Sequence, residues 1–264
     1  MYKIDYEKQM ALIEDDTNVS KQSTLEEFRK VFLQFVVFII SAYIVLYFGI
    51  GLFFNLMSKE TQIKLENLLT NLYSCKTIEL PKKEQDIILK IKNNILLNDN
   101  KFPKTSKLDI LIIDHDIKNA FCLPNGKIYI TNLLYNDVKT NEQALAFIIA
   151  HEMAHYRHKD HFMALRKIIV NNIIAILIAV GTGNKSITDS VSAIFDVSDL
   201  SHSRTAELKC DRYASRKLYE IYGTNEGGIQ ALEIISQNKK EAFELLATHP
   251  LTKRRIKILK SLNF

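Results

Sequence analysis

An apolar run from Val31 to Met57 contains no charged residue and limits what this chain can fold into. It reads VFLQFVVFIISAYIVLYFGIGLFFNLM, and only Gln34 and Asn55 are strongly polar. Because about 20 apolar residues span a bilayer, the run is long enough to cross one with some tilt. A cleaved signal peptide is the alternative, but the preceding segment is too long and too acidic for one. The sequence predicts a retained single-pass transmembrane helix over residues 31–57.

The anchor divides the chain into a polar N-terminal tail, residues 1–30, and one domain, residues 58–264. A composition of 47% hydrophobic and 25% charged residues is typical of a packed globular domain. Within about 20 residues of each end of the anchor, lysine and arginine are equally frequent, so the positive-inside rule does not decide the orientation. We expect a cell-membrane protein, with the side of the domain left open.

Cysteine count and charge exclude two classes of protein. Three cysteines are an odd number and form no Cys-x-x-Cys pair, so neither a disulfide framework nor a cysteine zinc site is expected. The net charge of +5 is modest, and its densest run, over residues 253–260, is typical of the solvated face of a terminal helix. We therefore predict no nucleic-acid partner.

Periodicity predicts an α+β domain. Apolar residues recur at helical spacing over residues 61–72 and 82–97. The short runs 108–113 and 127–131 are typical of strands, and Pro124-Asn125-Gly126 between them favours a turn. A later apolar run, 168–180, is thirteen residues long by this count and predicts a helix in the core or against the bilayer. A second crossing is the alternative.

The motif His151-Glu152-Met153-Ala154-His155 carries the chemistry. Two imidazoles four residues apart share one face of a helix, so both can face one zinc ion. The glutamate beside them is close enough to take a proton from water without occupying the metal. Thr140 and Gln143 form a capping box that predicts the helix start.

A catalytic zinc ion usually takes three protein ligands. His161 has the spacing of the metzincin pattern, but His158 stands where that pattern needs a helix-breaking glycine, and an unbroken helix would turn His161 about 240° from His155. Glu207 is the better candidate, because it shares a helix face with Asp211 and follows the motif at the distance typical of gluzincins. An ordinary exposed helix is the alternative for this segment.

Four segments together resemble the membrane-associated zinc metallopeptidases that include HtpX-like, Oma-type and CAAX prenyl proteases. They are Asn119 to Ile130, His151 to His155, Glu207-x-x-x-Asp211-x-x-Ala214, and Thr248-His249-Pro250 followed by Arg255. Cys210 stands where that family often has alanine. The resemblance covers about residues 70–260 and implies a predominantly helical zincin-like domain with a small β-sheet.

The resemblance also implies roles for single residues. His151, His155 and Glu207 would hold one Zn²⁺ per chain, and Glu152 would be the general base. His249 would stabilise the transition state or, alternatively, bind the metal as a fourth ligand. Asp211 and Arg255 would support the ligands, although Arg255 could instead contact substrate or belong to the basic terminal helix. Asn119 and Ala120 would bind the substrate backbone.

The sequence therefore predicts a membrane-anchored zinc metalloendopeptidase that cleaves extended or misfolded protein segments, with a role in protein quality control. The alternative is a catalytically silent zinc-binding module that holds a protein partner in the same groove. Prenyl-protein processing needs many spans, which a single anchor does not provide. The expected partners are protein or peptide substrates and the lipid bilayer, whereas the natural substrate and the oligomeric state stay open.

Overall fold

The computed structural model describes residues 24–71, 75–97, 99, 102, 108–182, 203–236, 249 and 253–262. The chain forms two compact units, Met1–Leu46 and Tyr47–Phe264, and the boundary lies within helix α2 (Thr24–Leu56). The stretch of this helix from residue 25 to residue 56 is long and apolar enough to cross a membrane, and most of its large apolar side chains are exposed. The helix fits a single transmembrane anchor, as predicted, although it begins before the apolar run. Helix α3 (Lys59–Asn71) follows it.

A small mixed sheet has the strand order β1-β2-β4-β3. Strands β2 (Asp109–Ile113) and β4 (Lys127–Thr131) are parallel, and both match the predicted runs. The edge strands β1 (Thr77–Ile78) and β3 (Ala120–Cys122) run antiparallel to their neighbours. Gly126 has a φ of 88°, which suits glycine in the turn that joins β3 to β4. The edge strands are too short to produce a periodic pattern in the sequence.

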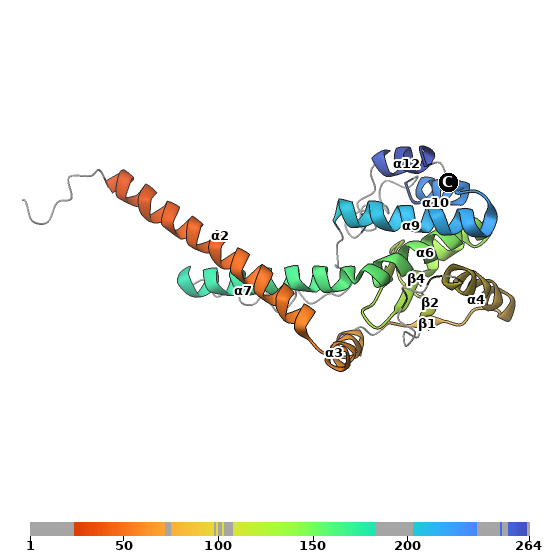
Figure 1. Ribbon diagram of the computed structural model, residues 1–264, viewed down its shortest axis with the longest axis horizontal. Helices are drawn as coiled ribbons and strands as arrows, with labels where there is room; N and C mark the ends of the chain where they lie inside the picture. Colours follow the sequence, from red (N-terminus) through yellow and green to blue (C-terminus); the bar gives the residue numbers. More distant parts are fainter. Residues whose placement is uncertain are drawn as a thin grey trace, which may run out of the picture. The chain divides into compact units, whose positions relative to one another are not determined.

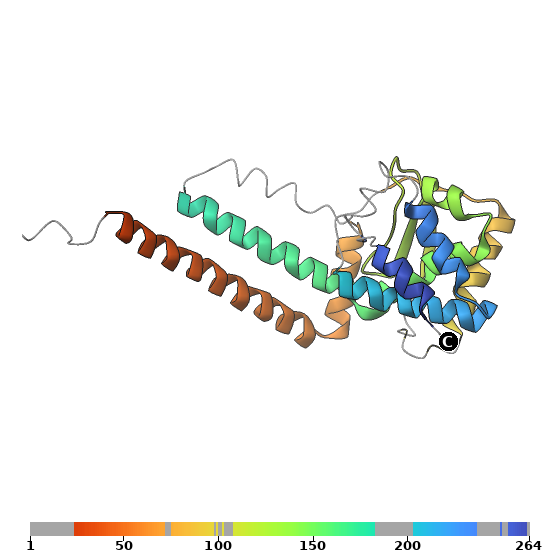
Figure 2. The ribbon, with the colours of Figure 1, turned by 90° about the horizontal axis from the view of Figure 1, so that it is seen from above.

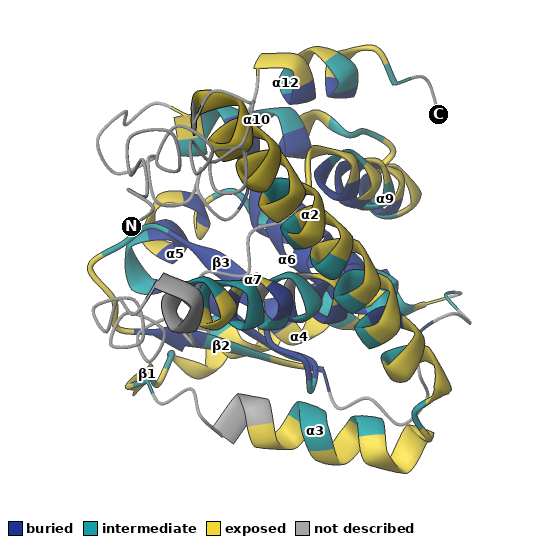
Figure 3. Ribbon diagram, turned by 90° about the vertical axis from the view of Figure 1, so that its left-hand side faces the viewer, coloured by how far each residue is buried: buried dark blue, intermediate teal, exposed yellow. Residues whose placement is uncertain are grey.

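Helix α6 (Glu142–His158) lies at the centre of the second unit, between the sheet and helix α9 (Arg204–Tyr222) (Figure 1). It also packs against α4 (Lys82–Leu96), α5 (Asn132–Val138) and α10 (Glu226–Ser236). Helix α12 (Lys253–Lys260) contacts α9 and α10. Every residue of α6 from 144 to 156 is buried, as the dark ribbon in Figure 3 shows. Polar groups on α6 therefore lie inside the protein.

The start of α6 differs from the prediction. Asn141 is the N-cap, and its side-chain oxygen accepts a hydrogen bond of 3.1 Å from the backbone N–H of Ala144. The helix is therefore capped one residue later than the capping box at Thr140 and Gln143 predicted. The prediction that the motif lies on a helix is confirmed.

The end of α6 also differs, because the helix does not continue unbroken through residue 161. Lys159 adopts a left-handed conformation with φ of 57°, and helix α7 (Asp160–Thr182), the long teal-green helix in Figure 2, begins directly after it. The apolar run predicted at 168–180 is therefore the later part of a longer helix. By length and composition, residues 160–178 form a second candidate span, and about 31% of its most apolar window is buried.

Candidate active site

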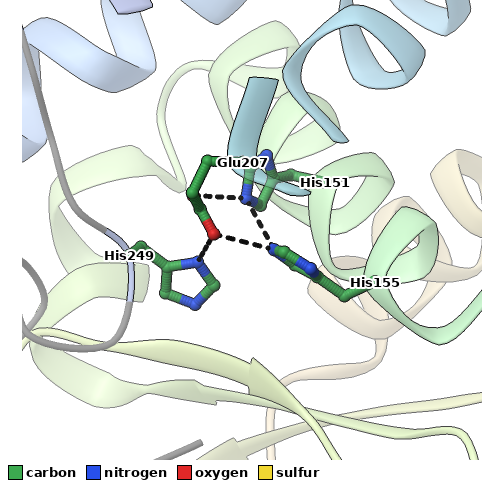
Figure 4. A group of neighbouring side chains, drawn as sticks. All are labelled: His151, His155, Glu207 and His249. Carbon is green, nitrogen blue, oxygen red and sulfur yellow. Dashed lines mark hydrogen bonds and ion pairs between the residues drawn. The ribbon is translucent and has the colours of Figure 1, made fainter. Parts of the chain in front are cut away.

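Four buried side chains from distant parts of the chain meet at one point (Figure 4). Nε2 of His151 lies 3.1 Å from Nε2 of His155. The carboxylate of Glu207 lies 3.3 Å from the first of these nitrogens and 3.2 Å from the second. Nδ1 of His249 lies 3.1 Å from Oε1 of Glu207. One potential ligand atom from each residue lies within 4.8 Å of those of the others.

Two packed helices produce this convergence. His151 and His155 lie one turn apart on the same face of α6, with ring centroids 4.8 Å apart. Glu207 lies in the first turn of α9, which packs along α6. The side chain of Ser203 caps α9 by accepting a hydrogen bond from the N–H of Ala206 and so fixes where the helix begins.

Each histidine of the motif has a carboxylate close to its Nδ1 atom. Nδ1 of His155 bonds Oδ2 of Asp160 at 2.8 Å, and Nδ1 of His151 lies 3.1 Å from Oδ1 of Asp211. A carboxylate at Nδ1 holds the proton there and leaves the lone pair of Nε2 for a metal ion. The left-handed residue Lys159 brings Asp160 back toward His155. Reasoning from sequence missed Asp160, because it assumed an unbroken helix.

Arg255 is buried in α12 and binds both carboxylates of α9. Its Nε and Nη2 each donate to Asp211 at 2.6 Å, and Nη1 lies 2.9 Å from Glu207 Oε2. Of the three roles considered for Arg255, the structure supports pairing with Asp211. The basic residues around it, Lys253, Arg254, Lys257 and Lys260, are exposed, as predicted for a solvated face.

The charge balance of the site fits a cation. Four carboxylates in and around the site, those of Glu152, Asp160, Glu207 and Asp211, are buried, and the guanidinium of Arg255 pairs with two of them, Glu207 and Asp211. Buried negative charge without a partner is unfavourable, so a divalent ion would offset the excess. Two imidazole nitrogens and a carboxylate oxygen that point at one another are also a donor set that zinc prefers. The residues therefore fit a metal ion of this kind.

Electrostatics inside the pocket agree with that balance. Burial lowers the pKa of His151, but Asp211 and Glu207 outweigh it and raise the pKa to about 10. Burial raises the pKa of Glu207, whereas His249 and His151 act in the opposite direction and hold it well below its ordinary value. The pocket thus favours a positive charge beside these rings.

Glu152 lies beside the cluster rather than in it. Its Oε1 lies 3.7 Å from Nε2 of His249. Its Oε2 is buried and has no hydrogen-bond partner among the described residues. A carboxylate oxygen in this position can accept a proton from a molecule that enters the site.

The edge strand β3 borders the site. Nε2 of His249 lies 3.2 Å from the carbonyl oxygen of Ala120. The backbone of Asn119 faces inward instead, because its N–H donates to Thr131 Oγ1 and its C=O accepts from the Thr131 N–H, both at 2.9 Å. In an antiparallel pair, successive residues of an edge strand point their backbone N–H and C=O groups alternately toward the neighbouring strand and away from it. The backbone groups of Ala120 and Cys122 therefore point to the edge of the sheet that no other described strand covers, and those of Asn119 do not.

Three other histidines, at positions 115, 158 and 161, lie outside the cluster. His161 is buried, stacks on Tyr156 and lies 3.8 Å from a carboxylate oxygen of Glu66. His158 is half-buried, and Cys210 lies between it and His155, with Sγ 3.4 Å from Nδ1 of His155. His115 is exposed, whereas His202, Thr248 and Pro250 lie outside the described residues. The three cysteines are free thiols.

Comparison with known proteins agrees with this geometry. The model of the family described as Peptidase family M48 matches residues 81–263, well over half of the chain. The chain belongs to peptidase family M48. Members of M48 are metal-dependent peptidases, so this chain is a metallopeptidase that acts on proteins or peptides. The resemblance inferred from four short segments is thereby confirmed.

A curated relative of this M48 chain is the mitochondrial metalloendopeptidase OMA1 of Arabidopsis thaliana. The two are 26% identical over 164 residues, which cover 59% of this chain and 31% of the relative. The matched region therefore spans less than a third of the relative's length.

Proposed function

We propose that this M48 chain is a membrane-anchored zinc endopeptidase that cleaves extended or misfolded protein segments, and that His151, His155 and Glu207 hold the zinc ion. The convergence of these three side chains beside Glu152, in a pocket with excess negative charge, supports the proposal most strongly. One ion per chain would satisfy the donor set, and three protein ligands would leave a position open for reaction.

When bound, a zinc ion would act as a Lewis acid that polarises the scissile carbonyl and lowers the pKa of water. Glu152 then takes the proton of the attacking water at Oε2, the oxygen without another partner among the described residues. The same carboxyl delivers that proton to the departing amine. His249, at 3.7 Å from Glu152 and on the side of the edge strand, donates to the oxygen that becomes negative in the tetrahedral intermediate.

Three further side chains position the proposed ligands without binding the metal: Asp160, Asp211 and Arg255. The two aspartates orient His151 and His155, and Arg255 holds Asp211 and Glu207 at fixed positions. A bidentate guanidinium–carboxylate pair is well suited to this positioning task.

The substrate would bind as an added strand on β3. Its backbone would pair with the outward groups of Ala120 and Cys122, and Asn119 would support the strand through Thr131 rather than touch the substrate. Only an extended segment can add to a sheet edge, so folded proteins would resist cleavage. Together with an anchor at residues 31–57, this selectivity supports a role in removing misfolded membrane or envelope proteins.

The test uses the full chain reconstituted in lipid nanodiscs, with unfolded casein as the substrate. We expect the zinc-loaded chain to cleave casein and Glu152→Gln to retain about one zinc ion while losing turnover by at least about 10³-fold, since the proton acceptor is removed. Metal content is measured by mass spectrometry, and cleavage by the release of new amino termini.

A His249→Ala form is the second arm, because it separates the two roles of this residue. Lower turnover at unchanged zinc affinity supports transition-state stabilisation, whereas weaker zinc binding indicates a fourth ligand. Equal cleavage by the starting chain and Glu152→Gln, or bound zinc without any cleavage, would favour the silent binding module instead.

A further inference from the structure

A small apolar cavity of about 30 Å³ opens beside the candidate active site. Its walls come from α5, α6 and α10, through Leu134, Phe147, Ile148, Leu232 and Ile235. Polar residues of the site, among them Glu152 and His249, also line it, as does Ala120 of the edge strand. A substrate bound along β3 would therefore pass directly over this cavity.

We propose that this cavity selects the substrate residue next to the cleaved bond and accepts a small aliphatic side chain such as that of alanine or valine. The inference rests on the proposed peptidase function and adds a substrate preference to it. Because Glu152 and His249 border both the cavity and the reacting bond, the side chain that enters belongs to a residue flanking that bond.

The chemistry of the walls excludes charged side chains. All five wall residues from α5, α6 and α10 are aliphatic or aromatic, so a charge placed among them would lose its hydration without gaining a partner. Arg255 also lines the cavity, but Asp211 and Glu207 already bind its guanidinium. An acidic side chain would in addition approach Glu152.

The volume limits the size of the side chain. A water molecule needs roughly 10–15 Å³ of such space, so the cavity holds a group about two or three heavy atoms in size. Valine fits this limit, and phenylalanine does not unless the walls move.

The walls have little freedom to move, because two glycines bring α10 into close contact with α6. A Cβ atom at Gly227 would meet the backbone of Gln143, and one at Gly228 would lie 2.6 Å from the ring of Phe147. The ring of Phe147 is in turn packed near His151, with centroids 6.1 Å apart. The walls from α6 and α10 thus belong to two helices that already touch.

Ile235 is the wall residue best suited to a test. It is only partly buried, and it lies on α10, a helix that contributes none of the proposed zinc ligands. Its neighbour Ile234 is also partly buried and packs against the same core, but it does not line the cavity. The same substitution at Ile234 is therefore a matched control.

The experiment again uses the zinc-loaded full chain in nanodiscs. Cleavage sites in unfolded casein are mapped by mass spectrometry, and a set of peptides then varies one flanking residue among alanine, valine, leucine, phenylalanine and aspartate. We expect kcat/KM for valine to exceed that for phenylalanine by on the order of 10-fold or more, and aspartate to be the poorest.

The variants test the wall directly. Ile235→Ala should raise the phenylalanine-to-valine ratio by on the order of 10-fold, Ile235→Phe should shift the preference to alanine, and Ile234→Ala should leave the ratio unchanged. Cleavage that depends on Glu152 but shows no preference for small aliphatic residues, or equal ratios in all three variants, would overturn the subsite while leaving the peptidase function intact. No cleavage by the starting chain would overturn both.

Discussion

At the scale of single residues, Asp160 positions the ring of His155, which we propose as a metal ligand. Its Oδ2 bonds Nδ1 of His155 at 2.8 Å in a buried environment. This contact selects the tautomer whose Nε2 lone pair faces the cluster, and it increases the basicity of the ring. The supporting shell of the site thus includes Asp160 as well as Asp211 and Arg255.

Replacing Asp160 tests this role. Asp160→Asn keeps the size of the side chain but removes its charge, so we expect zinc affinity to fall by roughly 10- to 100-fold. Competition with a chelating dye measures the affinity. Asp116→Asn, at an exposed position, is the control and should bind zinc as the starting chain does. Unchanged affinity in Asp160→Asn would show that the contact does not support the metal.

At the scale of elements, the two ends of α6 determine where its functional groups lie. Asn141 begins the helix, and Lys159 ends it in a left-handed conformation that starts α7 in a new direction. The side chain of Asn141 also donates to Gln230 of α10 at 2.6 Å. Asn141 thus caps α6 and links it to α10, the helix that contributes Leu232 and Ile235 to the cavity beside the site.

Removing this cap should weaken the fold. Asn141→Ala loses the cap and the contact to Gln230, so we expect the free energy of unfolding to fall by about 1–2 kcal/mol. Thr140→Ala is the control, because Thr140 is exposed and does not cap α6, and it should change stability by less than about 0.5 kcal/mol. Denaturant titration of both variants measures the difference, and equal losses would contradict the assignment of the cap to Asn141.

At the scale of the whole molecule, a peptidase unit is attached to a long apolar helix. Within the second unit, the last turns of α2 contact α7, where Arg166 lies 3.7 Å from the ring centroid of Tyr47 and the rings of Phe54 and Phe162 are 5.3 Å apart. We propose that residues 31–57 anchor the chain and that residues 58–264 form the peptidase domain.

Extraction of membranes tests the anchor. We expect the full chain to stay in the membrane pellet after an alkaline carbonate wash, because the exposed apolar side chains of α2 need a hydrocarbon environment. A chain that begins at residue 58 should be released. If that shorter chain also resists the wash, α7 enters the bilayer as well and is the second span.

The sequence alone was sufficient to predict the long apolar helix, the helix of the motif, two strands and four residues that meet in the candidate site, because spacing on one helix and apolar periodicity are local properties. The break at Lys159, the role of Asp160, the inward backbone of Asn119 and the cavity beside Glu152 depended on the tertiary structure. Each of these results from packing between segments far apart in the chain or from a single backbone conformation. Neither leaves a periodic signal among neighbouring residues.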